Sequence, residues 1–421
     1  MQSRERTAVG SMGSRRSPLL IIFFTILIDA IGWSMIVPLL PLYAHRFGAS
    51  EFRIGLLQSS FGIVQILAAP ILGRLSDRVG RRPVLLVSLI GTAGAFGIMG
   101  GAPTLAWLFV GRMLDGLTGG NISTAQAYIA DVTPPERRSR GMGLVGAAFG
   151  FGYTFGPAIG GLMSPISPAA PFFFAAGLAA ANAIALYFFL PESLSSEHRT
   201  KRGRRASIRQ VFEEGGNWQL KAILVTNFFG TVAFTILTTT YTLFAKQRFD
   251  FDAKQCGYVF AYVGLLGTLI QAGFIGRLSK VFGDKAVAIT GMIVFIASIF
   301  MLPVGSTLTM LVIATTGMAI GYNLMSPTIP ALASKTVGAA WQGRVLGVMA
   351  SSDSLGRIGG PIFGGWLLGR DAVNGFEHYG RTPFWAGAVI MCIALGLALT
   401  LRPERSRVDG EPAKEEAVEA T

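Results

Sequence analysis

Long apolar runs recur along almost the whole chain, separated by short polar segments. Each run is about 20 residues long, the length that an α-helix needs to cross the hydrocarbon core of a bilayer. Backbone polar groups in lipid must be satisfied within their own segment, so the pattern predicts an all-α membrane protein with about twelve transmembrane helices. The predicted spans are residues 19–43, 54–73, 83–102, 105–130, 141–163, 171–190, 221–245, 257–276, 286–304, 308–332, 345–368 and 383–401.

The longest polar gap, residues 192–220, divides the chain into two parts of six predicted helices each. The two parts resemble each other. The sequence GRLS at 73–76 recurs at 276–279, an offset of 203, and Gly-Pro at 156–157 recurs at 360–361, an offset of 204. This repeat predicts two pseudo-symmetric six-helix bundles, the arrangement in which transporters place substrate between repeats. The predicted organisation is an N-terminal tail at 1–18, a first bundle at 19–191, a basic linker at 192–220, a second bundle at 221–402 and a disordered tail at 403–421.

Basic residues are unevenly divided between the two sides of the predicted membrane. Of 36 lysines and arginines, 27 lie on the side that holds both termini and 7 on the other, while Arg112 and Arg357 lie within predicted spans. The positive-inside rule therefore predicts that both termini are cytoplasmic, in a multi-pass protein of the plasma membrane, or of the inner membrane in a bacterium. The net charge of +13 lies in short segments between apolar runs. It predicts contact with anionic lipid headgroups and excludes a nucleic-acid partner.

Composition narrows the function classes further. The chain is 51% hydrophobic and only 14% charged, whereas a soluble domain carries about 25% charged residues. Its two cysteines, Cys256 and Cys392, form no CxxC motif or Cys/His cluster, so we expect no metal site and no cofactor. HExxH, GxSxG and phosphate-binding loop motifs are absent from the sequence, which argues against a membrane enzyme. A non-transporting receptor is a further alternative.

The segment GRLSDRVGRRP, residues 73–83, falls at the predicted turn between helices 2 and 3. Its glycines allow a tight turn, and Asp77 is an acid among arginines that can pair with Arg81 or Arg82. The segment resembles the hallmark loop of the major facilitator superfamily at every defined position. The resemblance implies a latch between the two bundles, in which Asp77 docks near the start of helix 11 and Asp131 pairs with an arginine of the loop. The latch residues it implies are Gly73, Asp77, Arg78, Gly80, Arg81, Arg82 and Asp131.

Charged residues inside the predicted spans are the candidates for proton coupling. An intramembrane arginine is costly unless it faces a cavity or a partner, and Asp115 lies three residues after Arg112, on the same helix face. GRMLDGLTGG, residues 111–120, resembles the helix 4 arginine motif of proton-coupled superfamily members. Asp29, near the middle of helix 1, has no basic residue close in sequence. We therefore expect Asp29, Arg112 and Asp115 to carry the proton, with a structural ion pair as the alternative reading of the latter two.

Helix 5 carries GFGYTFGPAIGG at residues 150–161. Its glycines permit close helix packing, and its proline permits a kink. The segment resembles the signature of drug/proton antiporters in the superfamily, and the repeat in helix 11 gives a second such point. The predicted hinge residues are Gly156, Pro157, Gly360 and Pro361.

Further polar and aromatic residues of the spans are expected to line a substrate cavity at mid-depth. Asp353 and Arg357 share one face of helix 11 and can either lock the bundles or contact substrate. Trp33, one turn after Asp29, can pack on an apolar or aromatic substrate. The predicted cavity residues are Asp29, Trp33, Arg112, Asp115, Gln126, Tyr153, Asn227, Asn323, Asp353 and Arg357.

The resemblance to the superfamily extends over about residues 19–402 and is strongest to its tetracycline and multidrug exporters in the first half. Exporters of the best-known tetracycline type carry acids in helices 3 and 9 and a histidine in helix 8. Spans 83–102 and 286–304 contain no acid, and 257–276 contains no histidine, which argues against tetracycline itself. We therefore expect a proton-coupled antiporter that exports small organic molecules or drugs, acts as a monomer and has protons and membrane lipid as its other partners. The alternative is a uniporter or proton symporter of a metabolite or organic anion.

Overall fold

The computed structural model describes residues 18–119, 121–134, 138–194, 218–337, 339–375 and 378–401. Within these ranges the chain is helical apart from short turns, and no strand occurs. Most of the predicted linker at 192–220 and the two predicted tails lie outside the described residues.

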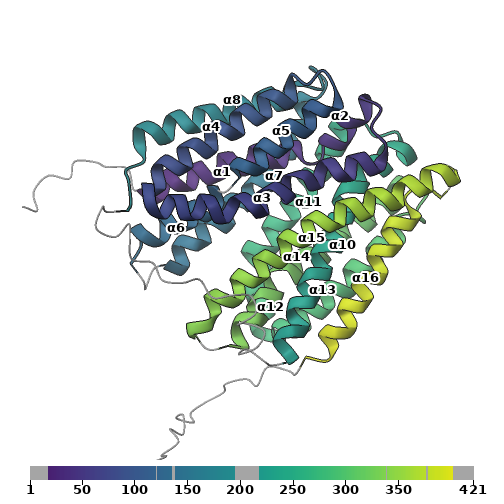
Figure 1. The fold of residues 1–421 in the computed structure, drawn as a ribbon. Coiled ribbons are helices and arrows are strands. Elements are labelled where there is room, and N and C mark those ends of the chain that lie inside the picture. Colours follow the sequence, from purple (N-terminus) through teal and green to yellow (C-terminus); the bar gives the residue numbers. More distant parts are fainter. Residues whose placement is uncertain are drawn as a thin grey trace, which may run out of the picture.

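The helices form two bundles, one from each half of the chain, which lie side by side in Figure 1. The first bundle consists of α1 (Pro18–Ile36), α2 (Leu40–Arg46), α3 (Glu51–Val79), α4 (Arg81–Gly100), α5 (Leu105–Thr118), α6 (Asn121–Val132), α7 (Arg138–Met163) and α8 (Ala170–Phe189). The second consists of α10 (Trp218–Phe249), α11 (Ala253–Leu269), the π-helix η3 (Ile270–Phe274), α12 (Ile275–Phe282), α13 (Asp284–Met301), α14 (Leu308–Lys335), α15 (Ala339–Asn374) and α16 (Arg381–Leu399).

Ten helices of the described chain are long and apolar enough to cross a membrane. Two further spans complete the set of twelve that the sequence predicts. One is the broken helix α5–α6, which carries Arg112 and Asp115, and the other is α15, which carries Asp353 and Arg357. The first is interrupted, so that α5 has only 14 residues, and the second is less uniformly apolar because it carries Asp353, Arg357 and several serines and glycines.

Local sequence signals explain where several helices begin. The Ser50 hydroxyl caps α3 by accepting from the N–H of Arg53. A capping box starts α11, where the Asp252 carboxylate accepts from the N–H of Gln255 at 2.7 Å and the Gln255 amide oxygen accepts from the N–H of Asp252 at 2.9 Å. Such caps satisfy backbone donors that have no partner within the helix.

The turn between α3 and α4 is shorter than the sequence pattern indicates. Residues 74–79 continue α3 and Arg81 already begins α4, so Gly80 is the only residue of the expected gap at 74–83 outside a helix. Gly80 has φ of +112°, a conformation that glycine adopts without steric cost. The predicted span ends at residue 73, before the helix does, because the polar residues that follow lie at a membrane surface and can continue the helix.

Two helix pairs join the bundles: α3 packs against α15, and α7 against α11. We call the end of the molecule that carries Pro18, Gly80 and Leu401 the terminal face. The end that carries Ser50 and Asp252 is the opposite face. This naming follows from the helices, which cross from one face to the other in alternation.

Candidate functional site

The bundles are in backbone contact toward the opposite face. A Cβ added to Gly55 of α3 would lie 2.2 Å from the carbonyl oxygen of Pro361 in α15. A Cβ on Gly257 of α11 would lie 2.6 Å from the Cα of Gly161 and 2.6 Å from the carbonyl oxygen of Pro157, both in α7. Only glycine permits these approaches, so two glycine contacts related by the internal repeat close this end of the interface.

Hydrogen bonds between the bundles reinforce the closed end. The Ser59 hydroxyl donates to the carbonyl oxygen of Ile358 at 2.6 Å, and the hydroxyls of Thr154 and Thr268 lie 3.0 Å apart. The Tyr379 hydroxyl donates to Glu51 Oε1 at 3.4 Å. Burial, together with the charge of Glu51, raises the pKa of Tyr379, so its phenol keeps the proton that it donates.

Toward the terminal face the same helices separate. Gly143 and Gly146 of α7 are exposed, and a Cβ on either would meet nothing within 4 Å. Gly143 shares its helix face with Gly161, which contacts α11 at the other end of α7. Gly347 of α15 is exposed in the same way. The space between the bundles is therefore open at the terminal face and closed at the opposite face.

A polar cluster lies in the second bundle at the depth where the bundles begin to separate. Asp353 Oδ1 accepts a hydrogen bond from the Asn227 amide at 2.6 Å and another from the Thr231 hydroxyl at 2.7 Å. These donors come from α10, which packs beside α15. Thr231 was not among the residues singled out from the sequence, because a single threonine in an apolar helix carries no signal of its own.

Arg357 lies one turn beyond Asp353 on α15 and is exposed despite its depth in the span. Its guanidinium lies within interaction range of the Tyr153 hydroxyl of the first bundle and within electrostatic range of Tyr322 and Asp353. Tyr153 is 38% exposed. Tyr153 and Arg357 differ by the 204 residues of the internal repeat, so equivalent positions of the two bundles face each other across the centre.

Aromatic rings surround this central contact on both sides. The Trp33 ring meets the Tyr153 ring edge to face, with centroids 5.7 Å apart. In the second bundle the rings of Phe234 and Tyr322 stack with centroids 3.7 Å apart. Trp33 and Tyr153 were expected at the cavity from the sequence, whereas Phe234 and Tyr322 gave no signal among 30 phenylalanines and 9 tyrosines.

A second charged cluster is buried in the first bundle. Arg112 Nη1 lies 3.2 Å from Asp115 Oδ2, and both side chains are almost fully buried. The Arg112 guanidinium also lies 4.8 Å from the centre of the Phe61 ring. Asp29 of α1 is within electrostatic range of Asp115. The three residues expected to carry the proton thus lie near one another: Arg112 pairs with Asp115, and Asp29 lies within electrostatic range of Asp115.

Two of the expected cavity residues lie outside both clusters. Asn323 accepts from the Gln271 amide at 2.8 Å and donates to the carbonyl oxygen of Ala319 at 2.9 Å, so it joins α14 to the π-helix η3. Gln126 is exposed on α6. π-helical turns are frequent at functional sites, and this one lies on the helix that lines the open half of the interface.

At the terminal face Arg81 is the centre of a buried ion-pair network. Its guanidinium lies 2.7 Å from Asp77, 3.1 Å from Asp131 and 2.7 Å from the Ser76 hydroxyl. Arg82 donates to the carbonyl oxygen of Tyr187. Asp131 therefore pairs with an arginine of the 73–83 segment, and docking of Asp77 at the start of helix 11 stays a prediction. Gly73 and Arg78 lie in the last turns of α3.

Glu192 is a member of this network that the sequence did not reveal. Its two carboxylate oxygens accept from the backbone N–H groups of Arg81 and Arg82 at 2.9 and 3.2 Å. A carboxylate at a helix N-terminus is stabilised by the helix dipole. A Cβ at Gly80 would lie 2.3 Å from Glu192, a second reason for glycine there.

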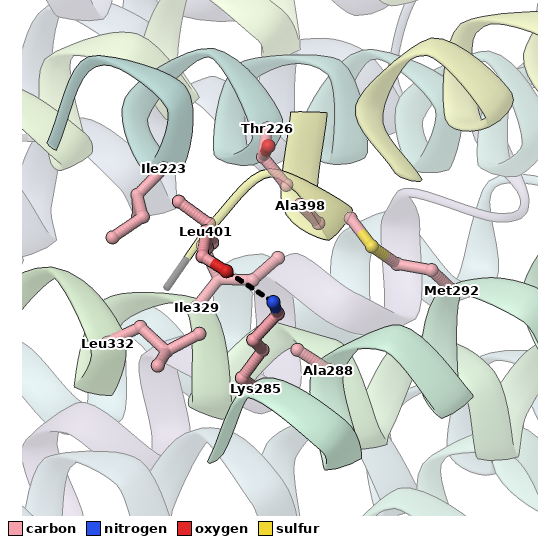
Figure 2. A pocket seen from close by; sticks show the side chains of 9 residues that line it. All are labelled: Ile223, Thr226, Lys285, Ala288, Met292, Ile329, Leu332, Ala398 and Leu401. Atoms are coloured by element: carbon pink, nitrogen blue, oxygen red, sulfur yellow. Dashed lines mark hydrogen bonds between the residues drawn. The ribbon is translucent and has the colours of Figure 1, made fainter. Parts of the chain in front are cut away.

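The second bundle repeats this network with the charges exchanged. Asp284, 203 residues after Arg81, lies 2.7 Å from Lys335, 204 residues after Asp131. Lys285 donates to the carbonyl oxygens of Leu399 and Leu401, as Arg82 does to Tyr187. Figure 2 shows Lys285 beside a small apolar pocket of the second bundle. This pocket lies inside one bundle, away from the central polar residues.

The predicted hinges lie where α7 and α15 pack on neighbouring helices. Gly156 packs against Ser34 and Ile31 of α1, and Gly360 against Thr235 and Val232 of α10. The Ser34 hydroxyl also donates to the carbonyl oxygen of Gly152 at 2.7 Å. Pro157 and Pro361 lie inside their helices, at the backbone contacts that join the bundles.

Comparison with known proteins places these features in a family. Residues 22–275 and 266–421 match the model of the Major Facilitator Superfamily. The chain is 34% identical to the tetracycline resistance protein, class C, of Escherichia coli over 82% of this chain and 88% of that protein. It is 27% identical to multidrug resistance protein 1 of Bacillus subtilis (strain 168), over 93% and 97% of the two chains.

A solved structure shares the fold at low sequence identity. It is a bacterial homolog of the human lysosomal transporter Spinster in an inward-facing, unoccupied conformation. The TM-score is 0.78 at 16% identity, over 92% of this chain and 97% of that one.

Proposed function

This chain belongs to the Major Facilitator Superfamily and is a multi-pass membrane transporter, and from that premise we propose that it is a proton-coupled antiporter that exports small organic molecules. The observation that carries the proposal is the cluster of Asp29, Arg112 and Asp115. Asp29 and Asp115 are two carboxylates within electrostatic range of each other in the membrane interior, and binding of one proton relieves the repulsion between them. The resistance proteins to which the chain is similar support export as the direction.

The proposed cycle uses the closed and open ends of the interface. We propose that the terminal face is cytoplasmic, as the distribution of lysine and arginine predicts. The structure then corresponds to a state in which substrate enters the central site from the cytoplasm. Rocking of the bundles breaks the glycine contacts at the opposite face, releases substrate and admits a proton to Asp29 or Asp115. Return of the protonated protein completes the exchange.

Tetracycline itself is not favoured as the substrate. α4 contains no acid, and the acid of α13, Asp284, is its first residue and pairs with Lys335 at the terminal face. The acids that the resemblance associates with tetracycline in helices 3 and 9 therefore have no counterpart at mid-depth. We keep the substrate of the proposed function at the level of a small organic molecule.

The test uses purified protein in liposomes with a pH-sensitive dye in the lumen. On addition of candidate drugs under an imposed pH gradient, we expect substrate flux against proton flux. Asp29→Asn and Asp115→Asn should each abolish the coupled proton signal. Asp250→Asn is the matched control, because Asp250 is an exposed loop acid at φ of +54°, which asparagine tolerates. Flux that ignores the gradient in the unmodified protein, with no effect of Asp29→Asn, rejects the proposal.

A uniporter or proton symporter of a metabolite or organic anion is the second candidate. The exposed Arg357 favours it, since an intramembrane arginine suits an anionic solute. The direction of accumulation separates the two functions: a symporter concentrates solute on the side to which protons flow, and an antiporter on the other.

A further inference from the structure

The central contact between the bundles has a polarity that restricts its ligand. Arg357 and Tyr153 meet there from repeat-related helices, and both are exposed. They lie where a transporter of this construction meets its substrate. The charge and shape of their surroundings therefore indicate a substrate class.

The acid of the site is held within its own bundle, whereas the cation faces the other bundle. Asp353 accepts two short hydrogen bonds from Asn227 and Thr231 of its own bundle. The Arg357 guanidinium is exposed and lies within interaction range of the Tyr153 hydroxyl of the opposite bundle. A guanidinium has five N–H donors and pairs with a planar anion in a two-pronged geometry. The Tyr153 hydroxyl is a further donor beside it.

Flat aromatic surfaces flank this donor group. Trp33 stands edge-on to Tyr153 in the first bundle, and the stacked pair Phe234 and Tyr322 stands in the second. Trp33, Phe234 and Tyr322 are all partly exposed. Aromatic faces at such distances accommodate a planar ring by stacking or edge contact.

We propose that the central site binds aromatic organic anions, with Arg357 and Tyr153 holding the anionic group and Trp33, Tyr322 and Phe234 holding the ring. An aromatic cation is disfavoured, because it would have to lie beside the exposed guanidinium of Arg357. The inference rests on the proposed transport function and narrows its substrate to one charge class.

The test compares two probes that share a ring system and differ in fixed charge. Naphthalene-2-sulfonate and naphthyl-trimethylammonium are titrated against the full-length protein in detergent, with binding measured by the shift in thermal unfolding. We expect the sulfonate to stabilise the protein and the ammonium to have no effect. Arg357→Gln should weaken sulfonate binding tenfold or more, and Arg357→Lys should weaken it less, because lysine keeps the charge but not the fork.

Arg370→Gln is the matched control for Arg357→Gln. It lies on the same helix, where its guanidinium stacks on Trp366 near the opposite face. The unfolding temperature of each variant without ligand shows whether it is folded. The proposal is overturned if the ammonium binds as tightly as the sulfonate, if neither binds, or if folded Arg357→Gln and Arg357→Lys bind the sulfonate with unchanged affinity.

Flux measurements separate this inference from the proposed function. Sulfonate binding that depends on Arg357, without any response of flux to a pH gradient, rejects proton antiport and keeps the substrate class. Exchange of protons for the ammonium but not the sulfonate rejects the substrate class and keeps antiport.

Discussion

The two bundles have ion pairs at equivalent positions of the terminal face, with the positive and negative residues exchanged. In the first, Arg81 at the start of α4 pairs with Asp131 at the end of α6; in the second, Asp284 at the start of α13 pairs with Lys335 at the end of α14. The repeat thus preserves the position of an ion pair but not its sign. An ion pair depends on the product of its charges, so exchanging both leaves the attraction unchanged.

The two bundles differ more in the charged residues of their interiors than in those of their ends. The buried pair Arg112 and Asp115 of the first bundle has Thr315 and Met318 at the corresponding positions of the second, 203 residues later. The second bundle places its charges, Asp353 and Arg357, on the helix that faces the centre. The ends therefore maintain the architecture, while the proposed proton site and the proposed substrate site are assigned to different bundles.

Removal of one charge from the interior of the first bundle should lower the free energy of unfolding most. Arg112→Met leaves Asp115 buried without its cation and should cost about 3–5 kcal/mol of unfolding free energy. Arg112→Met with Asp115→Leu should recover most of it, because the second bundle packs uncharged residues there. Unfolding in detergent measures both, with Met318→Leu as the control. If Arg112→Met alone is as stable as the unmodified protein, Arg112 and Asp115 do not form a buried ion pair.

Of the two ion pairs at the terminal face, Arg81–Asp131 should contribute more to the free energy of unfolding than Asp284–Lys335. Arg81 is 2% exposed, and Arg81→Ala removes several charged hydrogen bonds, for an expected loss of about 2–3 kcal/mol. Exchange of all three charges, Arg81→Asp with Asp77→Lys and Asp131→Lys, should restore part of this stability, because the second bundle has Lys280, Asp284 and Lys335 at these positions. The same unfolding assay applies, and a triple variant less stable than Arg81→Ala shows that the sign of the charges matters here.

The glycine contacts test the closure of the opposite face. Gly55→Ala places a methyl group against the Pro361 carbonyl, and overpacking of this kind should cost the closed state about 1–3 kcal/mol. A reporter cysteine introduced by Ser59→Cys should then react faster with a membrane-impermeant maleimide. Gly347→Ala, whose Cβ meets open space, should leave the rate unchanged. Equal rates in both variants contradict closure by this contact.

The ion pair of the second bundle should give the smallest effect. The Lys335 side chain is 55% exposed, and ion pairs with an exposed partner are worth about 1 kcal/mol or less. Asp284 is buried, but it lies in the first turn of α13, where the helix dipole stabilises a carboxylate without Lys335. Lys335→Ala should therefore change the unfolding free energy by no more than about 1 kcal/mol, and less at high salt. A loss comparable to that of Arg81→Ala removes the distinction between the two pairs.

Much of the architecture was predictable from local pattern. The apolar runs gave the transmembrane helices and the internal repeat gave the two bundles, as the structure and the comparisons confirm. The Asp284–Lys335 pair also follows from the internal repeat. An offset of 203 leads from Arg81 to Asp284, and an offset of 204 leads from Asp131 to Lys335. Helix ends were less accurate, as at 74–79, because a polar surface segment can stay helical.

The sequence by itself determined which side chains are charged inside the membrane and which pairs share a helix face, since these follow from composition and from the 3.6-residue period. Only the tertiary structure decided that Asp29 lies near Asp115, that Asn227 and Thr231 hold Asp353, and that Tyr153 meets Arg357. These contacts join residues up to about two hundred positions apart. The packing of whole helices determines them, and no local propensity specifies which faces meet.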